Sequence, residues 1–183
     1  MVDYFDTIWE GFMVIKEVTE ELIQEAIQFL PQDDQKVAYD LHELSKSLKL
    51  KIGMRRNLQK AGKGYCIEYS TKKPNRMLFI IKTGEKYKTK EVDFRVKANL
   101  FHIDDYREIA EESPIKMKEA IKSTPQCGKC NPVCYNVKSN YTLDGVFYEP
   151  CYIKGHNFEN LNSFEWSKLK QLIIEEYKAN TKL

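Results

Sequence analysis

Four of the five cysteines of this chain lie between residues 127 and 151, in the spacing Cys-x2-Cys-x3-Cys-x16-Cys. They are Cys127, Cys130, Cys134 and Cys151. Sulfur at this density indicates a metal site, a disulfide or a redox centre. For any of these, the fold must bring thiols that are far apart in the chain to one point in space.

Zinc is the metal that this spacing favours. Zn²⁺ takes four ligands in a tetrahedron, and a tight knuckle with two or three ligands plus a distant strand is its usual solution. Gly128 and Pro132 suit the sharp turns of such a knuckle. We therefore expect the four cysteines to hold a structural zinc ion, which supplies folding energy rather than chemistry.

Other states of the cysteines stay open at this point. The four thiols can be free and buried, or joined in disulfides. Cys127-Gly-Lys-Cys130 resembles a dithiol redox pair, although a redox pair needs neither Cys134 nor Cys151. The order of the spacings is the reverse of that in radical enzymes with an iron–sulfur cluster, which weakens that alternative. Cys66 stands alone, and we expect it to be a small buried apolar residue.

A hairpin turn downstream tests whether the four cysteines can meet. Residues 143–146, Leu-Asp-Gly-Val, predict a tight turn, because Asp-Gly tolerates the positive φ angles of a type I′ turn. A regular ladder from this turn would leave Cys134 and Cys151 about 13 Å apart along the strands, whereas thiolates on one zinc lie about 4 Å apart. The chain must therefore leave the ladder before Cys134, and Pro150 interrupts it. His156 lies near the knuckle in the same register and is the alternative fourth ligand.

Composition sets the class of protein. Of 183 residues, 42% are hydrophobic and 12% aromatic, enough for a real core. No apolar run approaches the roughly 20 residues that span a bilayer. The acidic start, Met1 to Asp6, lacks the features of a secretory signal. We therefore expect a cytoplasmic protein without membrane contact, in which disulfides are rare.

The net charge of +2 hides an uneven distribution. Residues 1–45 hold eleven acidic and two basic residues, whereas residues 46–76 hold ten basic residues and one acidic residue. Such a stretch can follow a phosphate backbone, but it can also face the acidic first helices or solvent. The lack of a nucleic-acid-binding motif favours the second interpretation. The candidate contacts under the first are Lys46, Lys49, Lys51, Arg55, Arg56, Lys60 and Lys63.

Hydrophobic periodicity predicts an α+β fold. Helices are expected over 20–30, from Asp33 or Asp34 to 48, from 104, from 114 and from Asn162. Alternation predicts strands near 65–69 and 92–98, and residues 77–81, which are apolar on both faces, suit a central strand. We expect an antiparallel sheet, a three-stranded meander plus a C-terminal hairpin, packed with about five helices. Residues 1–124 would form the α+β body, and 125–183 a cysteine-rich hairpin with the last helix, packed on the body as one unit.

Signs of catalysis are sparse. The chain has no phosphate loop and no nucleophile elbow, and only three histidines. His42 lies off the apolar stripe of its helix and is expected in solvent. His102 precedes Asp104 and Asp105, which suits either acid–base work or a helix cap. We expect the pair Glu175-Glu176 on an exposed helix face.

Residues 65–177 resemble a group of small, uncharacterised bacterial α+β proteins, many from firmicutes. The likeness rests on the meander, on the Asp105-Tyr106 helix start and on the tail with its Cys-x2-Cys-x3-Cys segment and the later Cys151. It implies a fold and a grouping of cysteines, and no activity. The function that we expect is a binding or regulatory protein with a structural zinc site and a small-molecule or protein partner. The alternatives are a nucleic-acid-associated factor and a thiol oxidoreductase that uses Cys127 and Cys130.

Overall fold

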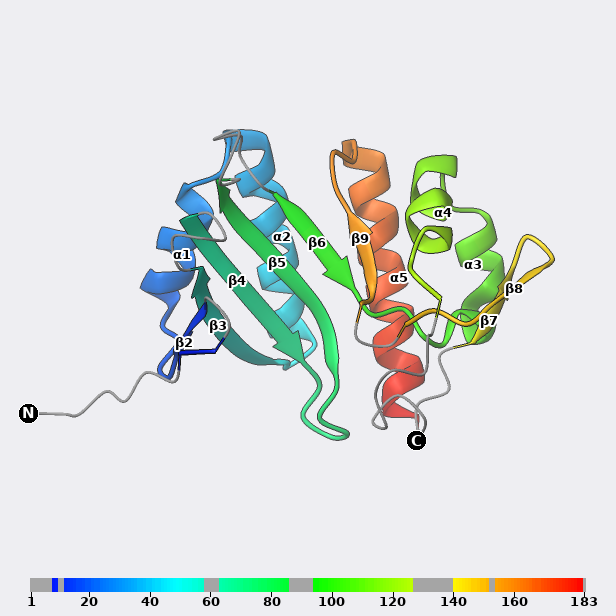
Figure 1. Cartoon of the computed structure of the whole chain (residues 1–183), viewed down its shortest axis with the longest axis horizontal. Coiled ribbons are helices and arrows are strands. Elements are labelled where there is room, and N and C mark those ends of the chain that lie inside the picture. The colour runs from blue at the N-terminus through cyan, green and yellow to red at the C-terminus, as the bar shows by residue number, and fades with distance from the viewer. Residues whose placement is uncertain are drawn as a thin grey trace, which may run out of the picture. The chain divides into compact units, whose positions relative to one another are not determined.

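The computed structural model describes residues 8–9, 12–57, 63–85, 94–126, 140–151 and 154–182. It confirms the α+β class, with α-helices and antiparallel strand pairs (Figure 1). The chain divides into two compact units. The first comprises Met1–Ser70 and Ile80–Arg95, and the second comprises Thr71–Phe79 and Val96–Leu183.

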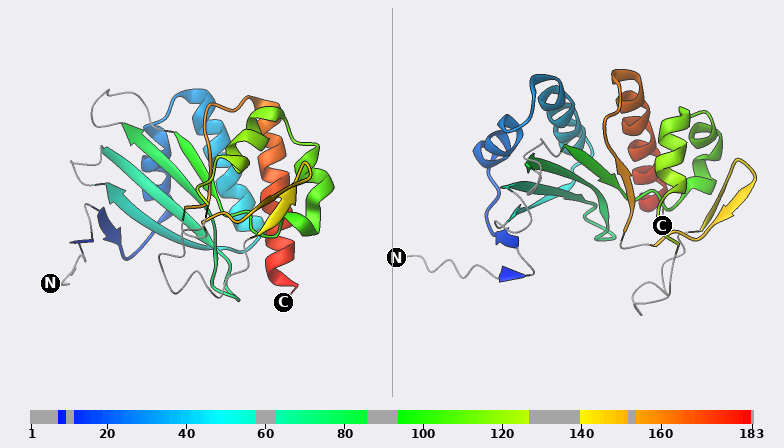
Figure 2. Two further views of the ribbon diagram at one scale, coloured as in Figure 1. Left: turned by 45° about the vertical axis from the view of Figure 1, so that its right-hand side comes forward. Right: turned by 45° about the horizontal axis from the view of Figure 1, so that its top comes forward.

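The first unit contains two helices that lie on the same face of its strands (Figure 2). The helices are α1 (Glu20–Gln28) and α2 (Gln32–Ser47). The strands are β1 (Ile8–Trp9), β2 (Phe12–Ile15), β3 (Lys51–Asn57), β4 (Lys63–Ser70) and the larger part of β5 (Met77–Glu85). Apolar residues of both layers form the core, among them Ile23, Ile27, Leu41, Met54 and Ile67.

The ends of these two helices test the predicted caps. The Oγ1 atom of Thr19 accepts a hydrogen bond from the backbone N–H of Leu22, which confirms the cap of α1. The prediction that Asp33 or Asp34 caps α2 was wrong. The helix begins two or three residues earlier than such a cap implies, at Gln32 after Pro31, and no side chain caps it. Proline fixes its own φ near the helical value, so a chain can enter a helix there without a side-chain acceptor.

The second unit is built around the long helix α5 (Ser163–Thr181). Its strands include β6 (Arg95–Ala98) and β9 (His156–Phe158), which pair antiparallel. The first residue of β6, Arg95, belongs to the first unit. The 3₁₀ helix η2 (Ile103–Tyr106), α3 (Arg107–Glu111) and α4 (Ile115–Lys122) lie on one side of α5 (Figure 1). Asn162 and Glu165 form the predicted capping box of α5 through reciprocal hydrogen bonds of 3.0 and 2.8 Å.

The larger sheet contains more strands than the predicted three-stranded meander. The order of the larger sheet is β1-β2-β3-β4-β5-β6-β9, and the chain passes between the units within β5 and within β6. Strands β4, β5 and β6 correspond to the three strands predicted from the sequence. Sequence reasoning missed β3, because its alternating apolar residues are few, and it missed the short strands β1, β2 and β9.

The predicted hairpin forms a separate two-stranded sheet of β7 (Tyr141–Leu143) and β8 (Val146–Tyr148). Asp144 and Gly145 are its turn residues, both with positive φ, and Leu143 pairs with Val146. The turn type and register are therefore those expected from the sequence. Among the residues described, no helix is long and apolar enough to cross a membrane.

Candidate functional site

Three of the four predicted zinc ligands, Cys127, Cys130 and Cys134, lie outside the described residues. Cys151 is buried, with 7% of its surface exposed, and forms no disulfide. Within the described ranges no group of three or more His, Cys, Asp and Glu side chains can hold a metal. The zinc site therefore stays a prediction. The structure describes residues on either side of the segment that contains Cys127, Cys130 and Cys134.

The backbone of Cys151 lies beside the residues that lead into the cysteine segment. Gln126 forms an isolated antiparallel bridge with Pro150. The backbone N–H of Cys151 donates to the carbonyl of Pro125 at 2.8 Å, and that of Glu149 donates to Oε1 of Gln126 at 2.9 Å. Beyond β8 the chain thus pairs with residues 125–126, which directly precede Cys127 in the sequence.

His156, the alternative ligand, is fully buried and has hydrogen-bond partners at both ring nitrogens. Nε2 lies 3.1 Å from the carbonyl oxygen of Leu100, so it must carry the proton that it donates. Nδ1 lies 2.6 Å from Oγ1 of Thr124 and 3.2 Å from the carbonyl oxygen of Ile121. With the proton of a neutral ring on Nε2, Nδ1 is the acceptor for the Thr124 hydroxyl, which also lies 3.2 Å from the carbonyl oxygen of Gly155. Burial lowers the pKa of His156 to about 4, because the imidazolium would lose its hydration. To bind a metal, this side chain would have to give up one of its present partners.

A buried carboxylate organises the other charged cluster of the second unit. Glu176 is 0% exposed on α5. Its Oε2 accepts from the backbone N–H groups of Phe101 and His102, both at 3.0 Å, and from the Tyr106 hydroxyl at 2.7 Å. Its Oε1 accepts from Nδ1 of His102 at 2.7 Å and from Nδ2 of Asn180 at 2.9 Å. We call these five residues the Glu176 centre.

The expectations for this cluster were partly wrong. Glu176 is buried rather than exposed, and it is Glu176, not Asp104 or Asp105, that bonds the imidazole of His102. The signal was present in the sequence, because position 176 continues the stripe of Leu169, Leu172 and Ile173 at helical spacing. A carboxylate on an apolar stripe indicates buried donors nearby.

The bond to Glu176 changes the ionisation of its partners. It raises the pKa of His102, because the negative carboxylate stabilises the imidazolium, while burial acts in the opposite direction. Burial, with Glu176 next to it, raises the pKa of the Tyr106 hydroxyl. The cluster therefore favours a protonated His102 ring and a neutral Tyr106 phenol beside Glu176.

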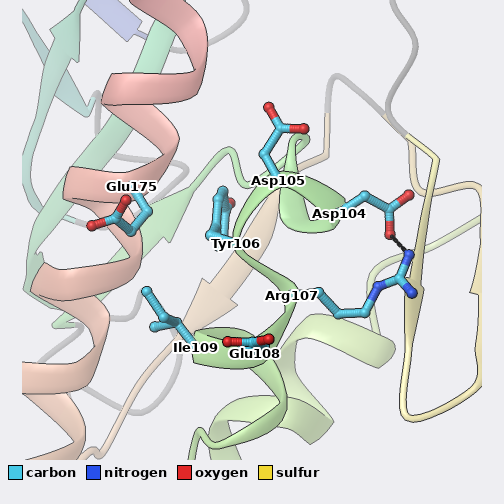
Figure 3. Close-up of a pocket in the computed structure, with 7 residues that line it drawn as sticks. All are labelled: Asp104, Asp105, Tyr106, Arg107, Glu108, Ile109 and Glu175. Carbon is cyan, nitrogen blue, oxygen red and sulfur yellow. Dashed lines mark hydrogen bonds and ion pairs between the residues drawn. The ribbon is translucent and has the colours of Figure 1, made fainter.

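A depression of about 650 Å³ adjoins the Glu176 centre through Tyr106. Figure 3 shows acidic side chains around Tyr106, with Arg107 turned toward Asp104, whose Oδ1 accepts from it at 2.6 Å. The same Oδ1 accepts from the backbone N–H of Thr142 at 2.9 Å. The lining consists of Asp104, Asp105, Tyr106, Arg107, Glu108, Ile109 and Glu175.

His42 lies inside the first unit, so the expectation of a solvated side chain was wrong. It is 2% exposed, with Nδ1 at 3.0 Å from the Tyr69 hydroxyl and Nε2 at 3.0 Å from Oε2 of Glu20. Tyr69 is fully buried, and burial raises the pKa of its hydroxyl. A polar residue beside an apolar stripe is buried here because helix α1 supplies a carboxylate.

The basic segment contains several side chains that already bind within the first unit. Lys46 forms ion pairs with Glu20 at 3.1 Å and Glu43 at 2.9 Å, and Arg55 pairs with Glu68. The guanidinium of Arg56 lies 5.7 Å from the centroid of the Tyr65 ring. Lys49 and Lys51 are exposed. Lys60 and the side chain of Lys63 lie outside the described residues, so nucleic-acid binding stays a prediction.

Comparison of the chain with protein-family models, with curated proteins and with solved structures finds no match. The resemblance to small bacterial α+β proteins therefore has no support beyond the residues quoted for it.

Proposed function

We propose that this chain is a binding or regulatory protein whose second unit is held by a structural zinc ion on Cys127, Cys130, Cys134 and Cys151. The observation that carries the proposal is the bridge between Gln126 and Pro150. Two bridged residues lie about 5 Å apart, and each is followed in the chain by a cysteine. The bridge thus pairs the residue before Cys127 with the residue before Cys151.

The course of the chain after the hairpin also supports the proposal. A ladder continued regularly from β7 and β8 would keep Cys134 and Cys151 too far apart for one ion. The chain instead pairs Pro150 with Gln126, and the N–H of Cys151 with Pro125 at 2.8 Å. This departure of residues 150 and 151 from the ladder supports a four-cysteine site.

The test is elemental analysis of protein purified without chelator. We expect one zinc per chain, and a lower thermal unfolding midpoint once a chelator has removed it, because zinc binding contributes to folding free energy. Cys151→Ala should lose the metal. Cys66→Ala is the matched control, since Cys66 is equally buried in the first unit and should retain it.

Two results would contradict the proposal. One is metal-free protein in which Cys127, Cys130, Cys134 and Cys151 all react as free thiols. The other is a zinc content that is the same in the Cys151→Ala and Cys66→Ala variants.

A further inference from the structure

The Glu176 centre links His102 to Arg76, which lies outside the centre, through one chain of hydrogen bonds. Oε1 of Glu176 accepts from His102 on one side and from Nδ2 of Asn180 at 2.9 Å on the other. Oδ1 of Asn180 in turn accepts from Nη1 of Arg76 at 3.3 Å. Glu176 and Asn180 are 0% and 4% exposed, so a buried pair orients two partly exposed cations.

His102 is the histidine of this chain whose ring has a nitrogen left for another molecule. The side chain is 22% exposed. Its Nδ1 is held by Glu176, and no hydrogen bond within the described ranges reaches its Nε2. His42 and His156, by contrast, have partners at both nitrogens. As the imidazolium favoured by Glu176, His102 directs an N–H donor away from the carboxylate.

Arg76 supplies the second set of donors. Its backbone is fixed by the turn before β5, where Thr71 N–H donates to the Arg76 carbonyl at 2.8 Å and Arg76 N–H donates to Oγ1 of Thr71 at 3.1 Å. One guanidinium N–H of Arg76 donates to Asn180, and the guanidinium has five N–H donors in all. The remaining donors suit the oxygen atoms of a carboxylate or phosphate.

We propose that Arg76 and His102 bind the oxyanion of a small molecule, a carboxylate or a phosphate, with Glu176 and Asn180 as the buried residues that position them. A proton-transfer role for His102 fits less well, because Glu176 favours the protonated ring, which donates rather than accepts. The site shares no residue with the cysteines, so its test does not depend on zinc.

Charged groups from three elements face the His102 ring and set the pH dependence of binding. Glu176 on α5 and Asp105 on η2 favour the imidazolium, and Arg76 on the turn before β5 disfavours it. Anion affinity should therefore be highest at acidic to neutral pH and fall as the pH rises through the raised pKa of His102. Asp105 competes with the ligand for the cations, so Asp105→Asn should tighten binding.

The experiment follows the Nε2 resonance of His102 by NMR while sulfate, inorganic phosphate or acetate is added. Sulfate serves for the pH series because its charge is constant across the neutral range. We expect saturable shifts, and about tenfold weaker binding in Arg76→Gln, the loss typical of one charge-assisted hydrogen bond. Tighter binding of phosphate or of acetate tells which class of oxyanion the site prefers.

Arg107→Gln is the matched control, since it removes a nearby exposed arginine that pairs with Asp104 and should leave the affinity unchanged. His102→Gln should abolish the pH dependence of sulfate binding measured by calorimetry. The proposal is overturned if His102 does not respond to any of the three anions. It is equally overturned if Arg76→Gln and Arg107→Gln weaken binding to the same extent.

Discussion

At the scale of single residues, the buried carboxylate of Glu176 and the buried imidazoles of His42 and His156 all have hydrogen-bond partners. Glu176 is fully buried and accepts five hydrogen bonds. His156 is fully buried and satisfies one nitrogen as a donor and the other as an acceptor. Burial without such partners would cost several kcal/mol for each group, so the removal of one partner has a large effect.

Glu176→Gln tests this point. The amide retains the shape of the side chain, but it cannot neutralise the imidazolium of His102, and its NH₂ group faces donors. We expect a loss of about 3–5 kcal/mol in the free energy of unfolding, the usual effect of breaking a buried ion pair. Chemical denaturation followed by the fluorescence of Trp166, on the same helix, measures it.

Glu175→Gln is the matched control for this substitution. Glu175 is the neighbouring residue on α5, its side chain is 23% exposed, and its partner is the surface residue Lys178 at 2.7 Å. We expect a change below about 1 kcal/mol, since an exposed ion pair contributes little. Equal losses in the two variants would mean that the five hydrogen bonds of Glu176 do not stabilise the fold.

At the scale of elements, local signals in the sequence place the helices well. The cap at Thr19 and the capping box at Asn162 are side-chain-to-backbone contacts within one turn, so the sequence around them is sufficient. The hairpin at Asp144-Gly145 is similarly local. Strand β3 could not be predicted in this way, because its pairing with β2 and β4 depends on residues far away in the chain.

Asn162→Ala removes the cap of α5. The backbone N–H of Glu165 then loses its acceptor at 3.0 Å, and we expect a loss of about 1 kcal/mol in stability. Ser167→Ala, an exposed change within the same helix, should be neutral or slightly stabilising because alanine has the higher helix propensity. Thermal unfolding by circular dichroism compares the two, and a neutral Asn162→Ala would show that the cap does not stabilise α5.

The candidate site was less predictable than the elements. The sequence indicates the cysteines and His102 as residues that carry chemistry, but not the partner of His102. Glu176 lies 74 residues away, and only the packing of α5 against η2 brings the two together. The roles of Arg76 and Asn180 likewise need three-dimensional proximity, because their hydrogen bond joins residues 104 positions apart.

At the scale of the whole molecule, two histidines give stability opposite dependences on pH. The pKa of His156 is depressed to about 4. As the pH falls, this histidine is therefore protonated in the unfolded chain before it is protonated in the folded chain. Stability should fall by roughly 3 kcal/mol as the pH drops from about 6.5 to 4. The pKa of His102 is raised, so its contribution is complete below the unfolded value near 6.5 and is lost as pH rises through the folded value.

The measurement is the free energy of unfolding from denaturant titrations across this range. We expect His156→Gln to flatten the acid limb of the pH profile and His102→Gln to flatten the alkaline limb, each leaving the other limb in place. A profile whose two limbs are unchanged in both variants would refute the assignment.

The position of Glu176 near the end of the second unit also affects how the protein is made. The donors that it serves, from Phe101 to Tyr106, are translated 70 to 75 residues earlier. At ordinary elongation rates they wait roughly 4 to 15 seconds for their acceptor. During that interval the nascent chain presents bare amide groups beside apolar residues. Slow codons before α5 would prolong this exposure and would give a chaperone more time to bind the emerging chain.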